Sequence, residues 1–145
     1  MARTLLHGEP VVRATLVACD RYIRRFAGWS LLAELSAAPG ASRLGGIEVS
    51  LPAIIAVDIA VATWWRSVGV EPAAVVGHST GEIAAAHVAG VLDLEDTMRT
   101  ICAYGRFVGR FSGRGGMAFV GLPWAACAQA LVGFEGRVFR AIEDS

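Results

Sequence analysis

The run Gly-His-Ser-Thr-Gly-Glu at residues 77–82 constrains the fold of this chain more than any other feature. An apolar run at residues 73–76 enters it, and an alanine-rich run at residues 83–86 leaves it. Where a strand reverses into a helix through Gly-x-Ser-x-Gly, the serine lies at a sharp bend called the nucleophile elbow. Glycines on both sides of the bend remove Cβ atoms that would clash in so tight a turn. The sequence therefore predicts a strand, a turn and a helix, with the Ser79 hydroxyl held outward.

Ser79 is consequently a candidate nucleophile that accepts acyl groups. The N-terminus of the helix behind it favours negative charge, and backbone N–H groups are free there to bind a developing oxyanion. We expect the N–H of Thr80 to be one of these donors. Serine between glycines also occurs in ordinary turns, and the strand–turn–helix context favours the nucleophile over that alternative.

The similarity to known sequences extends well beyond this motif. The segments that carry it are residues 7–11, 19–20, 28–32, 77–86, 89–96 and 113–118. Together they resemble the acyltransferase domains of polyketide and fatty-acid synthases, relatives of malonyl-CoA:acyl carrier protein transacylase. A generic serine esterase would share only Gly-x-Ser-x-Gly.

This resemblance implies an α/β fold. Residues 1–112 would form part of an α/β-hydrolase-like core that carries the elbow. Residues 117–145 would form the start of a ferredoxin-like inserted subdomain. From the sequence pattern, strands are expected at residues 73–76, 117–122 and 137–142. Helices are expected at residues 10–27, 52–65, 83–86, 94–111 and 123–131.

The resemblance also implies a two-step reaction. Ser79 would take an acyl group from acyl-CoA and pass it to the phosphopantetheine thiol of an acyl carrier protein. A serine needs a general base, normally a histidine, but none of His7, His78 and His87 matches the position of the family's base. That histidine would follow residue 145, and the glutamine that supplies the second oxyanion donor would precede this sequence. The chain is therefore expected to be an internal portion of an acyltransferase.

Three positions bear on the choice of acyl group. In the family, an arginine pairs with the free carboxylate of malonyl or methylmalonyl groups, and counting from Ser79 places that position at Tyr104. Leu51 stands where the family usually has glutamine, and Thr80 replaces the usual residue after the nucleophile. We expect His78, Tyr104 and Leu51 to contact the substrate. Because an unpaired buried carboxylate is costly, the chain would either accept an uncharged acyl group or have lost its function.

The composition argues against several other functional classes of protein. The 13 basic and 13 acidic residues cancel, which argues against a nucleic-acid-binding surface. Cys19, Cys102 and Cys127 lack the spacing of metal ligands or disulfides and are expected to be small buried side chains in a reducing cytoplasm. The most apolar run, residues 51–65, contains Asp58 and is short for a bilayer. We expect no metal, no bound cofactor, no nucleic acid and no membrane partner.

Three functions remain open from the sequence. The first is acyl transfer, with acyl-CoA, an acyl carrier protein and synthase modules as partners. The second is a serine hydrolase or editing esterase, in which water takes the acyl group. The third is an inactive acyltransferase remnant that only binds partners, with Arg106, Arg110 and Arg114 facing an acidic carrier. If this is the whole polypeptide, we expect either poor solubility or association with a partner chain that completes the fold, because an incomplete sheet exposes unpaired strand edges.

Overall fold

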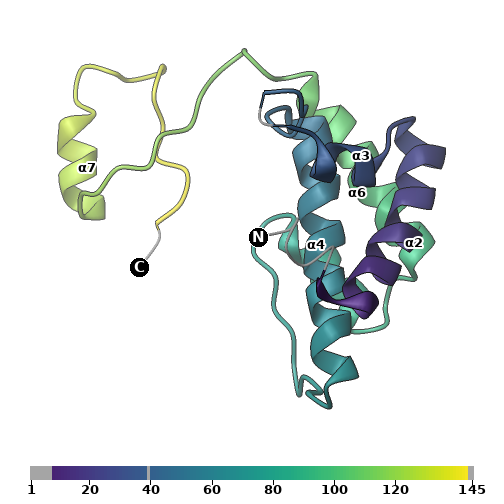
Figure 1. Ribbon diagram of the computed structural model, residues 1–145. Coiled ribbons are helices and arrows are strands. Elements are labelled where there is room, and N and C mark those ends of the chain that lie inside the picture. Colours follow the sequence, from purple (N-terminus) through teal and green to yellow (C-terminus); the bar gives the residue numbers. More distant parts are fainter. Residues whose placement is uncertain (1–7, 39, 144–145) are drawn as a thin grey trace. The chain divides into compact units, whose positions relative to one another are not determined.

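The computed structural model describes residues 8–38 and 40–143 (Figure 1). The chain divides into two compact units, Met1–Ser112 and Gly113–Ser145. The described residues form six α-helices and contain no strand. The α/β class implied by the resemblance is therefore not seen in the described part of this chain.

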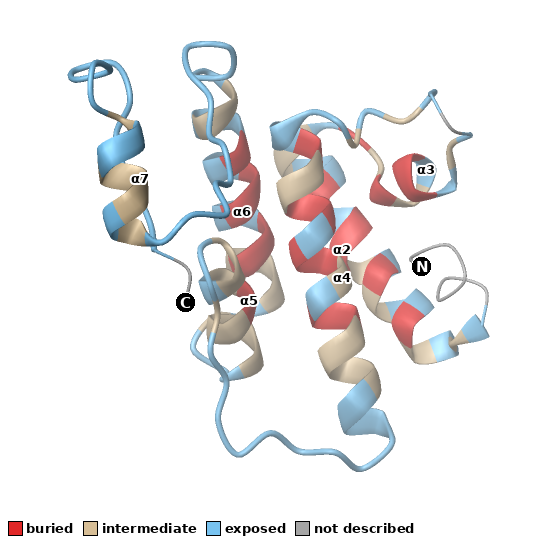
Figure 2. Cartoon of the chain, turned by 90° about the vertical axis from the view of Figure 1, so that its left-hand side faces the viewer, coloured by how far each residue is buried: buried red, intermediate tan, exposed pale blue. Residues whose placement is uncertain are grey.

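The first unit is a set of packed helices. Its helices are α2 (Pro10–Ala27), α3 (Leu31–Ser36), α4 (Ile47–Ser67), α5 (Gly81–Val88) and α6 (Leu94–Gly109). Helices α2, α4 and α6 pack on one another, while α3 lies against α2 and α5 lies against α4 and α6. The buried residues face the middle of this group (Figure 2).

Local signals explain where the helices begin and end. Helix α2 ends at Gly28, whose φ of 76° is readily adopted only by glycine and whose N–H donates to the Arg24 carbonyl. Helix α6 begins at Asp93, whose carboxylate accepts a hydrogen bond from the N–H of Asp96. The predicted end of the first helix at residue 27 and the predicted start of the later helix at residue 94 are confirmed. Helix α3, which was not predicted, is capped in the same way by Ser30.

None of the three predicted strands is present in the described residues, so those three predictions are wrong. Residues 73–76, 117–122 and 137–142 have no regular secondary structure. A strand forms only when a neighbouring segment pairs with its backbone N–H and C=O groups, and no described segment does so. In the second unit the one regular element that the structure describes is helix α7 (Trp124–Ala130), which lies within the predicted range 123–131.

Helix α4 is longer than expected. It begins at Ile47, five residues before the predicted start, and contains Pro52 within its second turn. With 21 residues and a mean hydropathy of 1.7, it is long and apolar enough to span a membrane by length and composition. The prediction that this segment is too short is therefore wrong. Seven of its residues are nevertheless buried against other helices, as in the core helix of a globular domain.

A buried carboxylate joins α2 to α3. Burial alone would raise the pKa of Asp20, but hydrogen bonds from Arg24, from the Ser30 hydroxyl and from the Leu32 N–H outweigh it and hold that pKa below its usual value. Asp20 therefore stays charged and fixes the turn between the two helices.

Two of the cysteines behave as predicted. Cys19 and Cys102 are buried, and burial raises their pKa to about 12 and about 11 respectively. Cys127 is half-buried, and all three thiols are free. Thiols with so high a pKa carry almost no thiolate at neutral pH, so Cys19 and Cys102 are chemically inert parts of the core.

Candidate functional site

The turn before α5 has the backbone strain expected of a nucleophile elbow. Ser79 has a φ of 55° and, among the described residues, is the one non-glycine residue with a positive φ. The turn is closed by hydrogen bonds from the Gly81 N–H to the His78 carbonyl (2.9 Å) and from the Glu82 N–H to the Ser79 carbonyl (3.2 Å). Backbone strain of this kind is common at functional sites, where it holds a side chain in a fixed direction.

The two glycines of the motif have different roles. A Cβ atom on Gly77 would lie 2.2 Å from the carbonyl carbon of Gly81 and 2.3 Å from the nitrogen of Glu82. A Cβ atom on Gly81 would meet nothing within 4 Å. The expectation that both glycines prevent a clash is right for Gly77 and wrong for Gly81 in the part of the chain described here. Gly77 is required because the backbone folds back on itself at that point.

The surroundings of Ser79 suit a developing negative charge. Ser79 is solvent-exposed, and α5 begins two residues later. Within the described residues the N–H of Thr80 makes no hydrogen bond, so it is available to an oxyanion. The partial positive charge at the N-terminus of α5 adds to this effect.

Neither described histidine side chain is hydrogen-bonded to Ser79. The His87 ring is hydrogen-bonded to another residue, since its Nδ1 lies 3.0 Å from the Leu92 carbonyl oxygen. His78 is exposed, and its side chain has no hydrogen-bond partner among the described residues. His7 lies outside the described residues. The structure thus presents a candidate nucleophile and one candidate oxyanion donor, and no described hydrogen bond joins Ser79 to a histidine.

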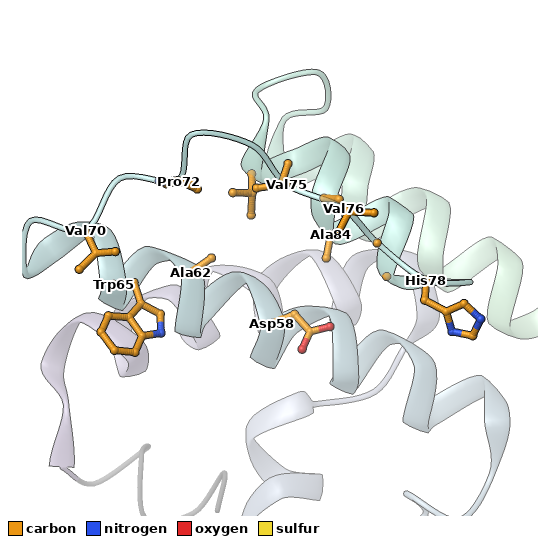
Figure 3. A pocket seen from close by; sticks show the side chains of 13 residues that line it. Asp58, Ala62, Trp65, Val70, Pro72, Val75, Val76, His78 and Ala84 are labelled. Carbon is orange, nitrogen blue, oxygen red and sulfur yellow. The ribbon is translucent and has the colours of Figure 1, made fainter. Parts of the chain in front are cut away.

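A cavity of about 540 Å³ lies beside the elbow (Figure 3). It is bounded by α4, by the connecting segment 70–78 and by α5, and its walls are mostly apolar. Its polar side chains are Asp58 and His78. Burial against this apolar wall raises the pKa of the Asp58 carboxyl. Sequence reasoning treated Asp58 only as an interruption of an apolar run and missed its place in the cavity.

The other predicted substrate residues lie on α4 and α6, outside this cavity. Tyr104 on α6 is 43% exposed, and Leu51 on α4 is half-buried against the core. Arg106, which was expected to face a carrier protein, instead donates a hydrogen bond to the Phe26 carbonyl at the end of α2. Among the described residues, no group of three or more His, Cys, Asp or Glu side chains could hold a metal ion.

Comparisons with known proteins point to one family. The family model described as "Acyl transferase domain" matches residues 1–143. The chain is 44% identical over 138 residues to erythronolide synthase EryA2 of Saccharopolyspora erythraea, which covers 95% of this chain and 4% of that protein. It is 45% identical over 139 residues to the spectinabilin polyketide synthase system protein NorC of Streptomyces orinoci, covering 95% of this chain and 6% of that protein.

Solved structures that are similar to this chain belong to the same family. The acyltransferase domain from module 8 of the salinomycin polyketide synthase matches 94% of this chain with a TM-score of 0.82 and 36% identity, over 32% of its own length. A loading acyltransferase from the avermectin modular polyketide synthase matches 78% of this chain with a TM-score of 0.74 and 41% identity, over 36% of its length. The chain thus spans a small part of the curated relatives and about a third of these solved domains.

Proposed function

Because this chain belongs to the acyl transferase domain family, we propose that it forms part of an acyltransferase of a modular polyketide synthase. We also propose that Ser79 carries the acyl group. The observation that supports this most strongly is the left-handed backbone of Ser79 at the turn into α5. In the complete fold, residues 73–76 would be a strand of an α/β-hydrolase-like sheet. Residues 117–145 would begin the ferredoxin-like subdomain, and the protein would act in the cytoplasm.

The proposed reaction has two halves. The Ser79 Oγ attacks the thioester carbonyl of acyl-CoA, and its proton passes to a general base. The oxyanion that forms accepts a hydrogen bond from the Thr80 N–H, and the C–S bond then breaks to release the CoA thiol and leave an ester on Ser79. The phosphopantetheine thiol of an acyl carrier protein attacks that ester, and the Ser79 hydroxyl is restored. No bound cofactor takes part.

A hydrolase is the second candidate, because the exposed position of Ser79 also admits water. The test follows a radiolabelled acyl group from CoA in the presence and absence of a carrier protein that bears phosphopantetheine. Transfer predicts label on the carrier thiol, formed by the native chain and not by Ser79→Ala. Label released as free acid at a rate that the carrier does not change would favour the hydrolase. Equal transfer by Ser79→Ala would contradict both candidates.

The substrate is proposed to be an uncharged acyl group, because Tyr104 takes the place of the arginine that would pair with a malonyl carboxylate. Tyr104→Arg should raise the ratio of malonyl to acetyl groups on Ser79 by about tenfold, which corresponds to roughly 1.4 kcal/mol. Intact-mass measurement after incubation with equal amounts of the two CoA esters gives this ratio. Tyr104→Phe is the matched control and should leave it unchanged. If the native chain is malonylated as fast as it is acetylated, the proposal fails.

A further inference from the structure

Helix α5 carries the elbow at its N-terminus but makes few buried apolar contacts. It has about two turns, roughly 12 Å in length, and begins two residues after Ser79. Of its eight residues, all of them described, Ala84 is the buried one, and the others are half-buried or exposed (Figure 2). So short a helix owes most of its stability to contacts with other elements. The polar contacts at the ends of α5 therefore help to decide where Ser79 is held.

The last carbonyl group of α5 is bound by a side chain from α4. The N–H groups of Val91 and Leu92, which would continue the helix beyond Val88, both donate to the Ala86 carbonyl instead. The Val88 carbonyl accepts a hydrogen bond from Nη2 of Arg66, at 2.7 Å. This hydrogen bond is charge-assisted, and a positive charge at the C-terminus of a helix is itself favourable. Arg66 therefore stabilises the end of α5 opposite to the elbow.

Arg66 also contacts the chain on the other side of the elbow. It lies in the last turn of α4, and its Nε is 3.4 Å from a carboxylate oxygen of Glu71. Both side chains are exposed, so this ion pair is the weaker of the two contacts. Glu71 lies eight residues before Ser79, and Val88 lies nine residues after it. One guanidinium group on α4 thus holds both ends of the segment that has the elbow at its centre.

We propose that Arg66 is a positioning residue for Ser79. By fixing the C-terminus of α5 and, more weakly, Glu71, it keeps the strained turn before α5 in one place. The Ser79 hydroxyl and the Thr80 N–H then stay in the arrangement that attack and oxyanion binding require. Arg66 acts through α5 and has no described contact with Ser79. Its effect on acyl transfer rests on the proposed function, whereas its effect on the turn does not.

Hydrogen–deuterium exchange of the 145-residue chain, followed by NMR, tests the effect on the turn. The N–H groups of Gly81, Glu82 and Ile83 donate the hydrogen bonds of the turn and should report its opening. Arg66→Met keeps a long apolar side chain and removes both polar contacts. We expect it to raise the exchange rates of these three amides about tenfold, as for the loss of one charge-assisted hydrogen bond. Arg66→Lys keeps the charge and a donor for Val88, so it should restore most of the protection.

Arg99→Met is the matched control for these exchange rates. Arg99 is also an exposed arginine on a helix, and its ion pairs with Glu95 and Asp96 lie within α6. Its loss should leave the three amides unchanged. If Arg99→Met raises their exchange as much as Arg66→Met does, the effect is not specific to Arg66 and the proposal is overturned.

The rate of Ser79 acylation tests the effect on the reaction. With acetyl-CoA as donor and imidazole as external base, Arg66→Met should lower the maximal rate about tenfold. The acetyl-CoA concentration that gives half of that rate should stay unchanged, because Arg66 does not contact the donor. A merely structural role would reduce the amount of folded protein and leave the rate per folded molecule as it is.

The two measurements separate this proposal from the proposed function. The proposal is overturned if Arg66→Met leaves the exchange of the three amides unchanged, or if folded Arg66→Met is acylated as fast as the native chain. If the native chain is not acylated at all, the proposed function fails, and the exchange rates alone decide whether Arg66 holds the turn.

Discussion

Replacing Gly77 with alanine is expected to lower the free energy of unfolding by about 3 kcal/mol, at the upper end of the cost of overpacking. The new Cβ atom would lie 2.2 Å from a backbone carbon of Gly81, and backbone at a hydrogen-bonded turn cannot move aside cheaply. The turn would open, and Ser79 would lose its left-handed conformation. Urea unfolding followed by circular dichroism measures the change.

Gly81→Ala is the matched control for this prediction. The Cβ atom would enter open space at the first position of α5, and alanine favours helix formation. We expect a change of less than about 0.5 kcal/mol. Equal losses of stability at the two glycines would contradict the described geometry of the elbow.

Replacing Ile55 with alanine should cost about 2–5 kcal/mol, the range found when a large buried aliphatic side chain is truncated. Ile55 is 0% exposed and lies in the core where α4 meets its neighbouring helices. Removing its outer carbons would leave a cavity that the packed helices cannot close. The same unfolding experiment measures the loss.

The adjacent isoleucine provides the control. Ile54 is 50% exposed, because it lies about 100° around the same helix from Ile55, so Ile54→Ala removes less buried surface. We expect it to cost less than about 1 kcal/mol. If the two variants are destabilised equally, the assignment of the buried face of α4 is wrong.

The parts of the fold that were predictable depend on local sequence. Gly28 and Asp93 act within four residues of the positions that they cap, so a sequence pattern is enough to locate those helix ends. The missed helix α3 carried a similar signal in Ser30, which is followed by apolar Leu31 and Leu35. The sequence places the start of α4 five residues too late, because proline favours the first turn of a helix and Pro52 lies in the second turn.

The strands could not be predicted from local sequence because a strand is defined by its partner. Residues 73–76 have the apolar composition of a strand, yet no described segment pairs with them. The same reasoning applies to the site. The elbow around Ser79 is encoded in six consecutive residues, whereas the cavity that contains Asp58 is built from three segments separated along the chain. The substrate-binding roles of His78, Tyr104 and Leu51 remain predictions.

The proposed function depends above all on Ser79 being the nucleophile that accepts the acyl group. The most direct measurement is intact-mass spectrometry of the 145-residue chain after incubation with a mixture of acetyl-, propionyl- and malonyl-CoA, followed by peptide fragmentation. Imidazole is added in parallel samples to serve as an external base, and Ser79→Ala is treated identically. We expect a mass increase of one uncharged acyl group, located on Ser79 and absent from Ser79→Ala. No acyl group on Ser79 in the folded chain with imidazole present, or an equal increase in Ser79→Ala, would contradict it.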